Sequence, residues 1–222
     1  MNQRLLWLSH VLEPDTPSYG GGEGFTVSPV KALAQGDSCN TSILSFPNHI
    51  GSHVDAPRHF LSNGSTIDAY APKDWIFTHP LMVDIPAKPG QLIGPEVFPS
   101  QDCASETVDL LLIRTGFEAY RDCDVYWQEG PGLLPELADY FRNHFPSLKA
   151  VGLDTISISG FQHRDIGRKA HAAFLSNDVR IFEDLSLMSI HGSRSLSQVA
   201  ALPLRFYNAD GSPCTILGWE QK

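Results

Sequence analysis

The densest group of chemically active residues in this chain is the stretch Asn48-His-Ile-Gly-Ser-His-Val-Asp-Ala-Pro-Arg-His-Phe60. Gly51 and Pro57 are poor material for a continuous helix. In a straight strand, at about 3.3 Å per residue, His49 and His53 would lie roughly 13 Å apart. We therefore expect the chain to fold back near Gly51, whose backbone is free to do so. His53 and Asp55, two positions apart, then point to the same side.

This stretch predicts a metal site. Its side chains that can bind a metal or move a proton are His49, His53, Asp55 and His59. An isolated histidine in a globular protein is commonly a satisfied structural side chain. Three histidines and an aspartate interleaved with glycine and proline fit neither an amphipathic face nor a helix cap, so they favour a functional site.

A second candidate segment lies far along the chain, at Val179-Arg-Ile-Phe-Glu183. Period-two alternation places Val179, Ile181 and Glu183 on one face of a strand. If that face is the core, the Glu183 carboxylate needs a cation or a proton, because burying it unpaired is costly. The alternative is a strand end at which Glu183 reaches solvent. His171, on the preceding predicted helix, is placed to approach the same spot.

Hydrophobic periodicity predicts strands that alternate with helices. Apolar runs predict strands over residues 5–8, 25–33, 41–46, 81–85, 108–113, 150–153 and 179–183. Helical spacing predicts helices over residues 135–145 and 162–175. The fold class is therefore α/β, with a mixed sheet and flanking helices in one domain over residues 1–222. Residues 1–45 are expected to form a strand-rich N-terminal arm, a candidate oligomer contact.

Composition excludes several classes of partner. The 222 residues carry a formal net charge of −9 with no run of Lys or Arg, so we expect neither nucleic acid nor an anionic membrane as a partner. The apolar run at residues 5–8 is too short for a signal peptide or a membrane span of about 20 residues. The four cysteines (Cys39, Cys103, Cys123 and Cys214) show no Cys-x-x-Cys spacing, which favours reduced thiols in a cytoplasmic protein.

The stretch from His49 to Phe60 resembles the signature of the cyclase-like family that includes bacterial kynurenine formamidase and isatin hydrolase. The resemblance continues in Ile113-Arg-Thr-Gly116, in Gly152-Leu-Asp-Thr155, and in Ala170-His171 leading to Ile181-Phe-Glu-Asp-Leu185. The chain departs from the family pattern at Ser52, which replaces a threonine, and at Ser159, which stands where an acid is often found. The segment 160–165 has no counterpart that we can map onto kynurenine formamidase.

The resemblance implies a compact β/β/α fold, a homodimer or homotetramer, and a site for one or two ions of zinc or manganese. It implies that His49 and His53 bind one metal and His171 a second, with Asp55 and Glu183 as bridging ligands. His59 would be the proton shuttle. Ligands without thiolates suit Zn²⁺ and Mn²⁺, and zinc has the higher intrinsic affinity.

Our mechanistic hypothesis is hydrolysis of an amide in a small-molecule substrate by a metal-bound hydroxide, with His59 moving the proton. His59 as a further ligand, or as a partner of Asp55, is the alternative role. Alternative functions are ring-opening of a lactam or lactone, and metal binding without turnover. Candidate substrate contacts are Tyr19, Phe25, Phe60 and Trp75, for which plain packing is the competing interpretation, and His163 and Arg164 are polar candidates.

Overall fold

The structure is a computed structural model that describes residues 3–98, 106–192 and 195–221. Within these ranges, one mixed sheet of nine strands has the order β5-β12-β13-β4-β11-β10-β8-β6, and β1 also pairs with β13. Its strands are β1 (Gln3–Trp7), β4 (His53–Asp55), β5 (Ile76–Phe77), β6 (Pro80–Asp84), β8 (Leu110–Arg114), β10 (Ala150–Leu153), β11 (Arg180–Glu183), β12 (Leu196–Pro203) and β13 (Gly211–Gln221).

The sheet is divided into a parallel and an antiparallel half. Strands β6, β8, β10 and β11 run parallel to one another. From β11 the pairing becomes antiparallel through β4, β13, β12 and β5. The predicted mixed sheet is confirmed, and β4 lies at the junction between its two halves.

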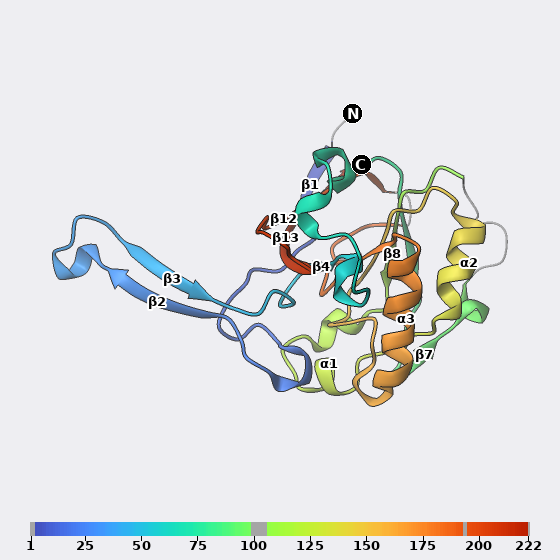
Figure 1. Ribbon diagram of the computed structural model, residues 1–222, viewed down its shortest axis with the longest axis horizontal. Coiled ribbons are helices and arrows are strands. Elements are labelled where there is room, and N and C mark those ends of the chain that lie inside the picture. Colours follow the sequence, from blue (N-terminus) through green and yellow to red (C-terminus); the bar gives the residue numbers. More distant parts are fainter. Residues whose placement is uncertain (1–2, 99–105, 193–194, 222) are drawn as a thin grey trace.

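Helices α2 (Glu136–His144) and α3 (Arg164–Ser176) cover one face of the parallel half (Figure 1). The short helix α1 (Val125–Gln128) packs instead in a small separate core with Phe117 and Ile156. The predicted helices over 135–145 and 162–175 correspond to α2 and α3, although residues 161–163 form a 3₁₀ turn before α3 begins. A small sheet of β7 (Leu92–Ile93) and β9 (Gly132–Leu133) lies outside the main sheet.

Only part of the predicted arm projects from the molecule. Strands β2 (Thr26–Lys31) and β3 (Thr41–Ser45) form a hairpin that extends away from the rest of the chain (Figure 1). The first predicted strand of that arm, however, is β1, which pairs with β13 in the main sheet. The expectation of an arm over all of residues 1–45 is therefore wrong for β1, because its backbone hydrogen bonds are made in the sheet.

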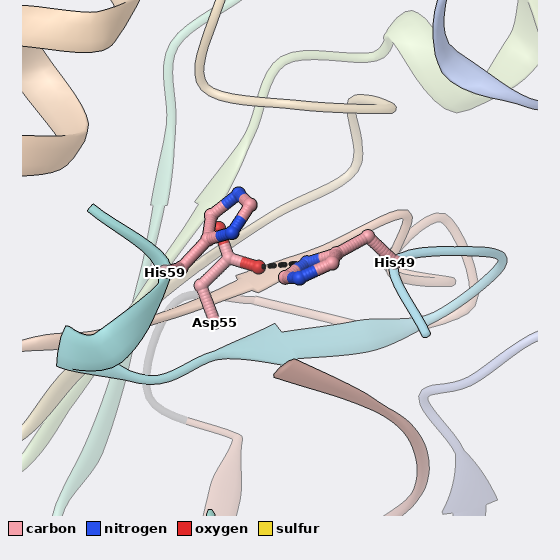
Figure 2. A group of neighbouring side chains, drawn as sticks. All are labelled: His49, Asp55 and His59. Carbon is pink, nitrogen blue, oxygen red and sulfur yellow. Dashed lines mark hydrogen bonds and ion pairs between the residues drawn. The ribbon is translucent and has the colours of Figure 1, made fainter. Parts of the chain in front are cut away.

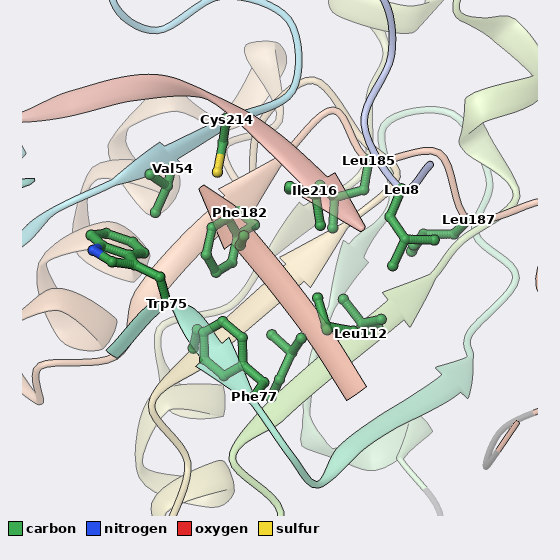
Figure 3. Packing of buried hydrophobic residues seen from close by; sticks show 14 of the residues in the cluster. Leu8, Val54, Trp75, Phe77, Leu112, Phe182, Leu185, Leu187, Cys214 and Ile216 are labelled. Carbon is green, nitrogen blue, oxygen red and sulfur yellow. The ribbon is translucent and has the colours of Figure 1, made fainter. Parts of the chain in front are cut away.

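Side chains of successive residues enter two different cores. Leu110 and Leu112 of β8 pack with Phe77 and Phe182 in one core, part of which Figure 3 shows. Leu111 and Ile113 of the same strand pack instead beneath α2 and α3. This alternation is the strand period of two, applied to a sheet that is buried on both faces.

The same alternation sets the candidate site on the helix-covered face. Val54 and Phe182 point into the first core, so their neighbours His53, Asp55 and Glu183 point to the opposite side. In the β4–β11 register, Glu183 lies opposite His53 and Ile181 opposite Asp55. Helix α3 passes over this face, since Ala170 and Phe174 pack there.

Among the described residues, Cys39, Cys123 and Cys214 are free thiols, as expected, while Cys103 lies outside them. In the same described part of the chain, no helix combines the length and the apolar character that crossing a bilayer requires.

Candidate metal centre

Four residues from three distant segments form the buried centre of the site. His53 Nε2 lies 3.5 Å from Asp55 Oδ1 and 3.3 Å from Glu183 Oε2. His171 Nε2 lies 3.4 Å from Asp55 Oδ2 and 3.3 Å from Glu183 Oε1. All four side chains are almost fully buried. The structure thus brings together the two segments that the sequence analysis singled out, and Glu183 does not reach solvent.

Both buried imidazoles are oriented by a backbone carbonyl. His53 Nδ1 lies 2.8 Å from the oxygen of Gly51, and His171 Nδ1 lies 2.8 Å from the oxygen of Gly167. A carbonyl only accepts hydrogen bonds, so Nδ1 donates in both rings and Nε2 is the nitrogen presented to the carboxylates. The chain folds back before His53 as expected, because Gly51 has a left-handed φ of 59°.

The two carboxylates differ in how well they are satisfied. Glu183 Oε1 accepts hydrogen bonds from the Ser157 hydroxyl at 3.0 Å and from the Ile158 amide at 2.7 Å. Asp55 Oδ2, in contrast, is buried and accepts no hydrogen bond from the described residues. An unsatisfied buried carboxylate oxygen facing imidazole nitrogens is expensive unless a cation neutralises it.

His49 and His59 lie beside this centre, nearer to solvent. His49 Nδ1 is 2.7 Å from Asp55 Oδ1, the contact drawn in Figure 2. The rings of His49 and His59 stack with their centroids 3.9 Å apart. Asp210 is the residue directly before β13. It lies within hydrogen-bonding distance of both rings, at 3.2 Å from His49 Nε2 and 3.1 Å from His59 Nδ1.

Mutual attraction between these groups shifts their pKa values strongly. Burial lowers the pKa of the His171 imidazole, but the facing carboxylates of Asp55 and Glu183 outweigh it and raise that pKa to about 10. Burial likewise opposes the shift at His49, where the Asp55 charge and the Asp210 hydrogen bond raise the pKa to about 10. Burial and the Asp55 charge act to raise the pKa of Glu183, yet hydrogen bonds from His171 and His53 hold it at about 2. At His59, burial dominates and lowers the pKa, which favours a neutral ring.

A cavity of about 540 Å³ opens onto these groups. Its wall includes the predicted substrate contacts Tyr19 and Phe60, together with Arg164. Phe60 also stacks on His171, with ring centroids 4.6 Å apart. This cavity is large enough for a small aromatic substrate.

The other predicted contacts lie elsewhere. Trp75 is 3% exposed in the core and packs against Tyr70 and the Arg180 guanidinium. The prediction that Trp75 contacts substrate is wrong. Trp75 ends the 3₁₀ turn before β5, and β5 pairs with β12. The indole therefore packs into the core that contains Phe77 and Phe182, on the face of the sheet opposite the site. Phe25 is also buried, against Phe46, and is not part of the cavity wall. Neither is His163, although its neighbour Arg164 is.

Sequence reasoning missed Asp210 and Ser157. Asp210 stands 151 positions after His59, and only the pairing of β13 with β4, which sets Gly211 opposite Asp55, brings it to the site. The sequence Asp210-Gly211 carries the turn signal of a hairpin, which could have marked this position as a turn but not as part of the site. Ser157 shows no comparable signal.

The chemistry of the donor set fits a divalent metal. His49, Asp55 and His59 form one group of potential ligands, and His53, Asp55 and Glu183 form another, each with its ligand atoms within 4.8 Å of one another. His171 Nε2 faces the two carboxylates of the second group. Imidazole nitrogens and carboxylate oxygens without thiolate are donors that Zn²⁺ and Mn²⁺ accept.

Known proteins resemble this chain over most of its length. A kynurenine formamidase from Geobacillus thermodenitrificans is 28% identical over 211 residues, which cover 93% of this chain and 92% of that protein. Isatin hydrolase A from Labrenzia aggregata, bound to benzyl benzoate, superposes with a TM-score of 0.84 at 20% identity, covering 99% of this chain and 94% of the other. A structure described as a predicted metal-dependent hydrolase from Bacillus stearothermophilus gives a TM-score of 0.78 at 18% identity and full coverage, 100% of each chain.

The family assignment rests on the N-terminal two thirds of the chain. The Cyclase family model matches residues 6–159, a range that contains the whole stretch from His49 to Phe60. This chain belongs to the Cyclase family.

Proposed function

We propose that this chain is a metal-dependent hydrolase that cleaves the amide bond of an aryl formamide or a closely related aryl amide. The observation that carries the proposal is Asp55 Oδ2, a buried oxygen that accepts no hydrogen bond from the described part of the chain and faces His171 Nε2 at 3.4 Å. The kynurenine formamidases among its relatives support the amide substrate, and the solved structure described as a predicted metal-dependent hydrolase supports the metal.

The residues that would hold the metal are His49, His53, Asp55, His171 and Glu183. When bound there, Zn²⁺ or Mn²⁺ would lower the pKa of water and polarise a substrate carbonyl. Zinc is favoured over manganese by its higher affinity for nitrogen donors. Ser157 and the Ile158 amide hold Glu183 in place, so this ligand is oriented before any ion arrives.

His59 is the group best placed to move a proton. It lines the cavity, and burial lowers its pKa, so its ring is neutral and able to accept a proton near pH 7. A base with these properties can take a proton from the attacking water and return it to the leaving nitrogen. Tyr19 and Phe60 offer apolar surface in the same cavity for the aryl group.

The function is tested on purified protein stripped of metal and reloaded with Zn²⁺ or Mn²⁺. Hydrolysis of N-formylkynurenine and of formanilide is followed by absorbance, and isatin serves as the ring-opening comparison. We expect metal-dependent turnover of the formamides. Turnover of isatin alone would replace the formamidase assignment with a cyclic amide hydrolase, and absence of turnover despite bound metal would overturn the proposal.

A matched pair of variants separates the metal centre from the cavity rim. Glu183→Gln removes a buried carboxylate from the cluster, whereas Glu23→Gln removes one from the cavity wall outside it. We expect Glu183→Gln to lose both bound metal and turnover. Glu23→Gln should keep the metal, measured by elemental analysis.

A further inference from the structure

Asp210 is a carboxylate outside the signature stretch that touches two of its histidines. Its Oδ2 lies 3.2 Å from His49 Nε2 and 3.1 Å from His59 Nδ1. Its Oδ1 accepts a hydrogen bond from the Asn48 amide at 2.7 Å. Both oxygens are therefore engaged, although 38% of the side chain is exposed.

These contacts determine which ring nitrogens carry protons. An ionised carboxylate only accepts hydrogen bonds, so the nitrogens facing Oδ2 are donors. The Asp210 oxygens face the Asn48 amide and one nitrogen of each imidazole, an arrangement that suits an acceptor-only carboxylate. His49 then carries a proton on Nε2 and presents Nδ1 to Asp55, the side of the metal centre. His59 carries its proton on Nδ1, which leaves Nε2 as its only proton acceptor when the ring is neutral.

The backbone holds Asp210 in this position. The Ala56 amide donates to the Asp210 carbonyl at 2.9 Å, and the Ile67 amide donates to the Ala209 carbonyl at 2.8 Å. The next residue, Gly211, has no side chain. A Cβ at this position would lie 2.1 Å from His49 Cε1 and would collide with the imidazole. The Asp210-Gly211 pair is thus a built support for the His49 ring.

We propose that Asp210 is a positioning residue that orients His49 as a metal ligand and fixes His59 as the Nδ1–H tautomer. The role of His49 needs only a bound metal, whereas the role of His59 as a base rests on the proposed hydrolase function. One carboxylate would then couple metal binding to proton transfer, because it is hydrogen-bonded to both rings. Carboxylates that accept a hydrogen bond from a metal-bound histidine contribute about 10-fold to 100-fold in metal affinity or activity.

The first test reads the tautomer directly. The ¹⁵N shifts of the His59 ring are recorded in Zn²⁺-loaded protein, with assignment by the spectrum of His59→Gln. We expect wild type to show a protonated Nδ1 and an unprotonated Nε2. In Asp210→Ala the proton should move, wholly or in part, to Nε2. An unchanged His59 pattern in Asp210→Ala would overturn the proposal.

The second test measures metal affinity by competition with a chelator. Asp210→Ala should weaken Zn²⁺ binding by about 10-fold or more. Asp68→Asn is the matched control. Asp68 lies in the 3₁₀ turn 67–69, and the Ile67 amide of this turn donates to the carbonyl of Ala209, next to Asp210. Asp68 touches neither imidazole in the described contacts. Equal affinities in the two variants would contradict the role of Asp210.

Asp210→Asn keeps the test decisive if Asp210→Ala destabilises the fold. Its amide is isosteric but has a single acceptor oxygen and no charge, so it cannot accept from the Asn48 amide and from the two imidazoles at the same time. We expect normal thermal unfolding, weaker Zn²⁺ binding, and a kcat reduced by about 10-fold to 100-fold with little change in KM. Wild-type affinity and wild-type kcat would refute the proposal.

These readouts separate the two proposals. If no amide is hydrolysed, the proposed function fails, but the tautomer and the Zn²⁺ affinity still decide the role of Asp210. If amides are hydrolysed and both readouts are unchanged, only the role of Asp210 fails.

Discussion

Asp55 shows how a single residue can require a cation. Three imidazole nitrogens lie within 3.5 Å of its carboxylate, from His49, His53 and His171. Protons on these rings and a dication compete for the same negative charge. A metal must displace protons to bind, because only the deprotonated nitrogen has a lone pair to donate.

We expect metal binding to release protons at pH 7. The pKa of His49 and of His171 is raised to about 10, so both rings are protonated before a metal arrives. Calorimetry in buffers of different ionisation enthalpy should detect about one to two protons released per ion. The apparent affinity for Zn²⁺ should also rise from pH 6 to pH 8. A binding heat that is independent of the buffer would contradict these shifts.

The same shifts give the stability of the metal-free protein a defined pH dependence. A histidine whose folded pKa is raised from 6.5 to about 10 contributes stability below pH 6.5 and loses it as the pH rises towards 10. We therefore expect the free energy of unfolding to fall over this window. Urea titrations at several pH values measure it, and Zn²⁺-loaded protein should show a weaker dependence.

Replacing His59 should separate turnover from metal binding. His59 lies beside the buried centre and burial lowers its pKa, which suits a base better than a ligand held by charge. We expect His59→Ala to keep its metal while kcat falls by about 100-fold to 10,000-fold. Loss of the metal in this variant would instead make His59 a ligand, the alternative that its grouping with His49 and Asp55 leaves open.

Gly211 provides a steric test of the His49 position. A Cβ at Gly211 would lie 2.1 Å from the His49 ring, so Gly211→Ala should push the imidazole away from Asp55. We expect Zn²⁺ affinity to fall by about 10-fold or more, the range for a disturbed ligand support. Gly24→Ala is the control, because the nearest atom to its Cβ is the Pro14 carbonyl oxygen at 3.8 Å. Equal affinities would show that His49 does not bind the metal in this position.

At the scale of elements, local sequence patterns predicted the parallel half of the sheet well. The apolar runs at 81–85, 108–113 and 150–153 became β6, β8 and β10, because strands buried on both faces need continuous hydrophobic sequence. The pattern at 179–183 also predicted β11 correctly, and of the two placements that the sequence left open for Glu183 the structure shows the buried one.

The antiparallel half was not predictable in this way. Strand β13 contains Gly211, Pro213 and Gly218, residue types that normally argue against a strand interior. It forms because β4, β12 and β1 supply hydrogen-bond partners along it. These partners are distant in the sequence, so no local pattern reveals the pairing. Asp210 was missed for the same reason.

The end of β11 depends on a buried ion pair. Asp184 follows Glu183 with a left-handed φ of 53°, and the Arg121 guanidinium donates to both of its carboxylate oxygens at 2.9 and 2.8 Å. Arg121→Ala would leave this buried carboxylate with the Tyr126 hydroxyl but without its cation. We expect a loss of about 3–5 kcal/mol in the free energy of unfolding.

Chemical denaturation measures that loss, and Arg142→Ala is the control, since Arg142 contacts Asn177 at the surface. A similar effect of both substitutions would mean that the Arg121–Asp184 pair is not what stabilises this turn. The turn matters for the site because it fixes the chain immediately after Glu183.

At the scale of the whole molecule, the β2–β3 hairpin projects away from the rest of the described chain (Figure 1). Every residue of both strands is exposed, including Val27, Val30, Ile43 and Leu44. Residues 26–45 contain only two charged side chains, Lys31 and Asp37. A lone two-stranded hairpin is at best marginally stable in water. An apolar, nearly uncharged hairpin is therefore better suited to packing against another surface than to solvent.

We predict that a second copy of the chain covers this hairpin, in a homodimer or homotetramer. The body of the molecule offers apolar surface to receive it, around a second cavity lined by residues that include Trp7, Val11 and Leu204. Trp7 and Leu204 are each more than half exposed. A symmetric pair of copies would exchange hairpins, so each apolar contact would be made twice.

Light scattering with size-exclusion chromatography tests this assembly. The double substitution Ile43→Asp and Leu44→Asp places charge on both faces of β3, and we expect it to reduce the measured mass towards that of one 24.4 kDa chain. Met188→Asp alters an apolar residue of comparable exposure outside both the hairpin and the second cavity, and it should leave the mass unchanged. A monomeric wild type would refute the prediction.

The assembly would also act on the site. Tyr19 and Pro47 flank the hairpin and line the cavity at the metal centre. A dimer formed through the hairpin would therefore hold the entrance of this cavity in place, and the variant with two added aspartates should show a raised KM.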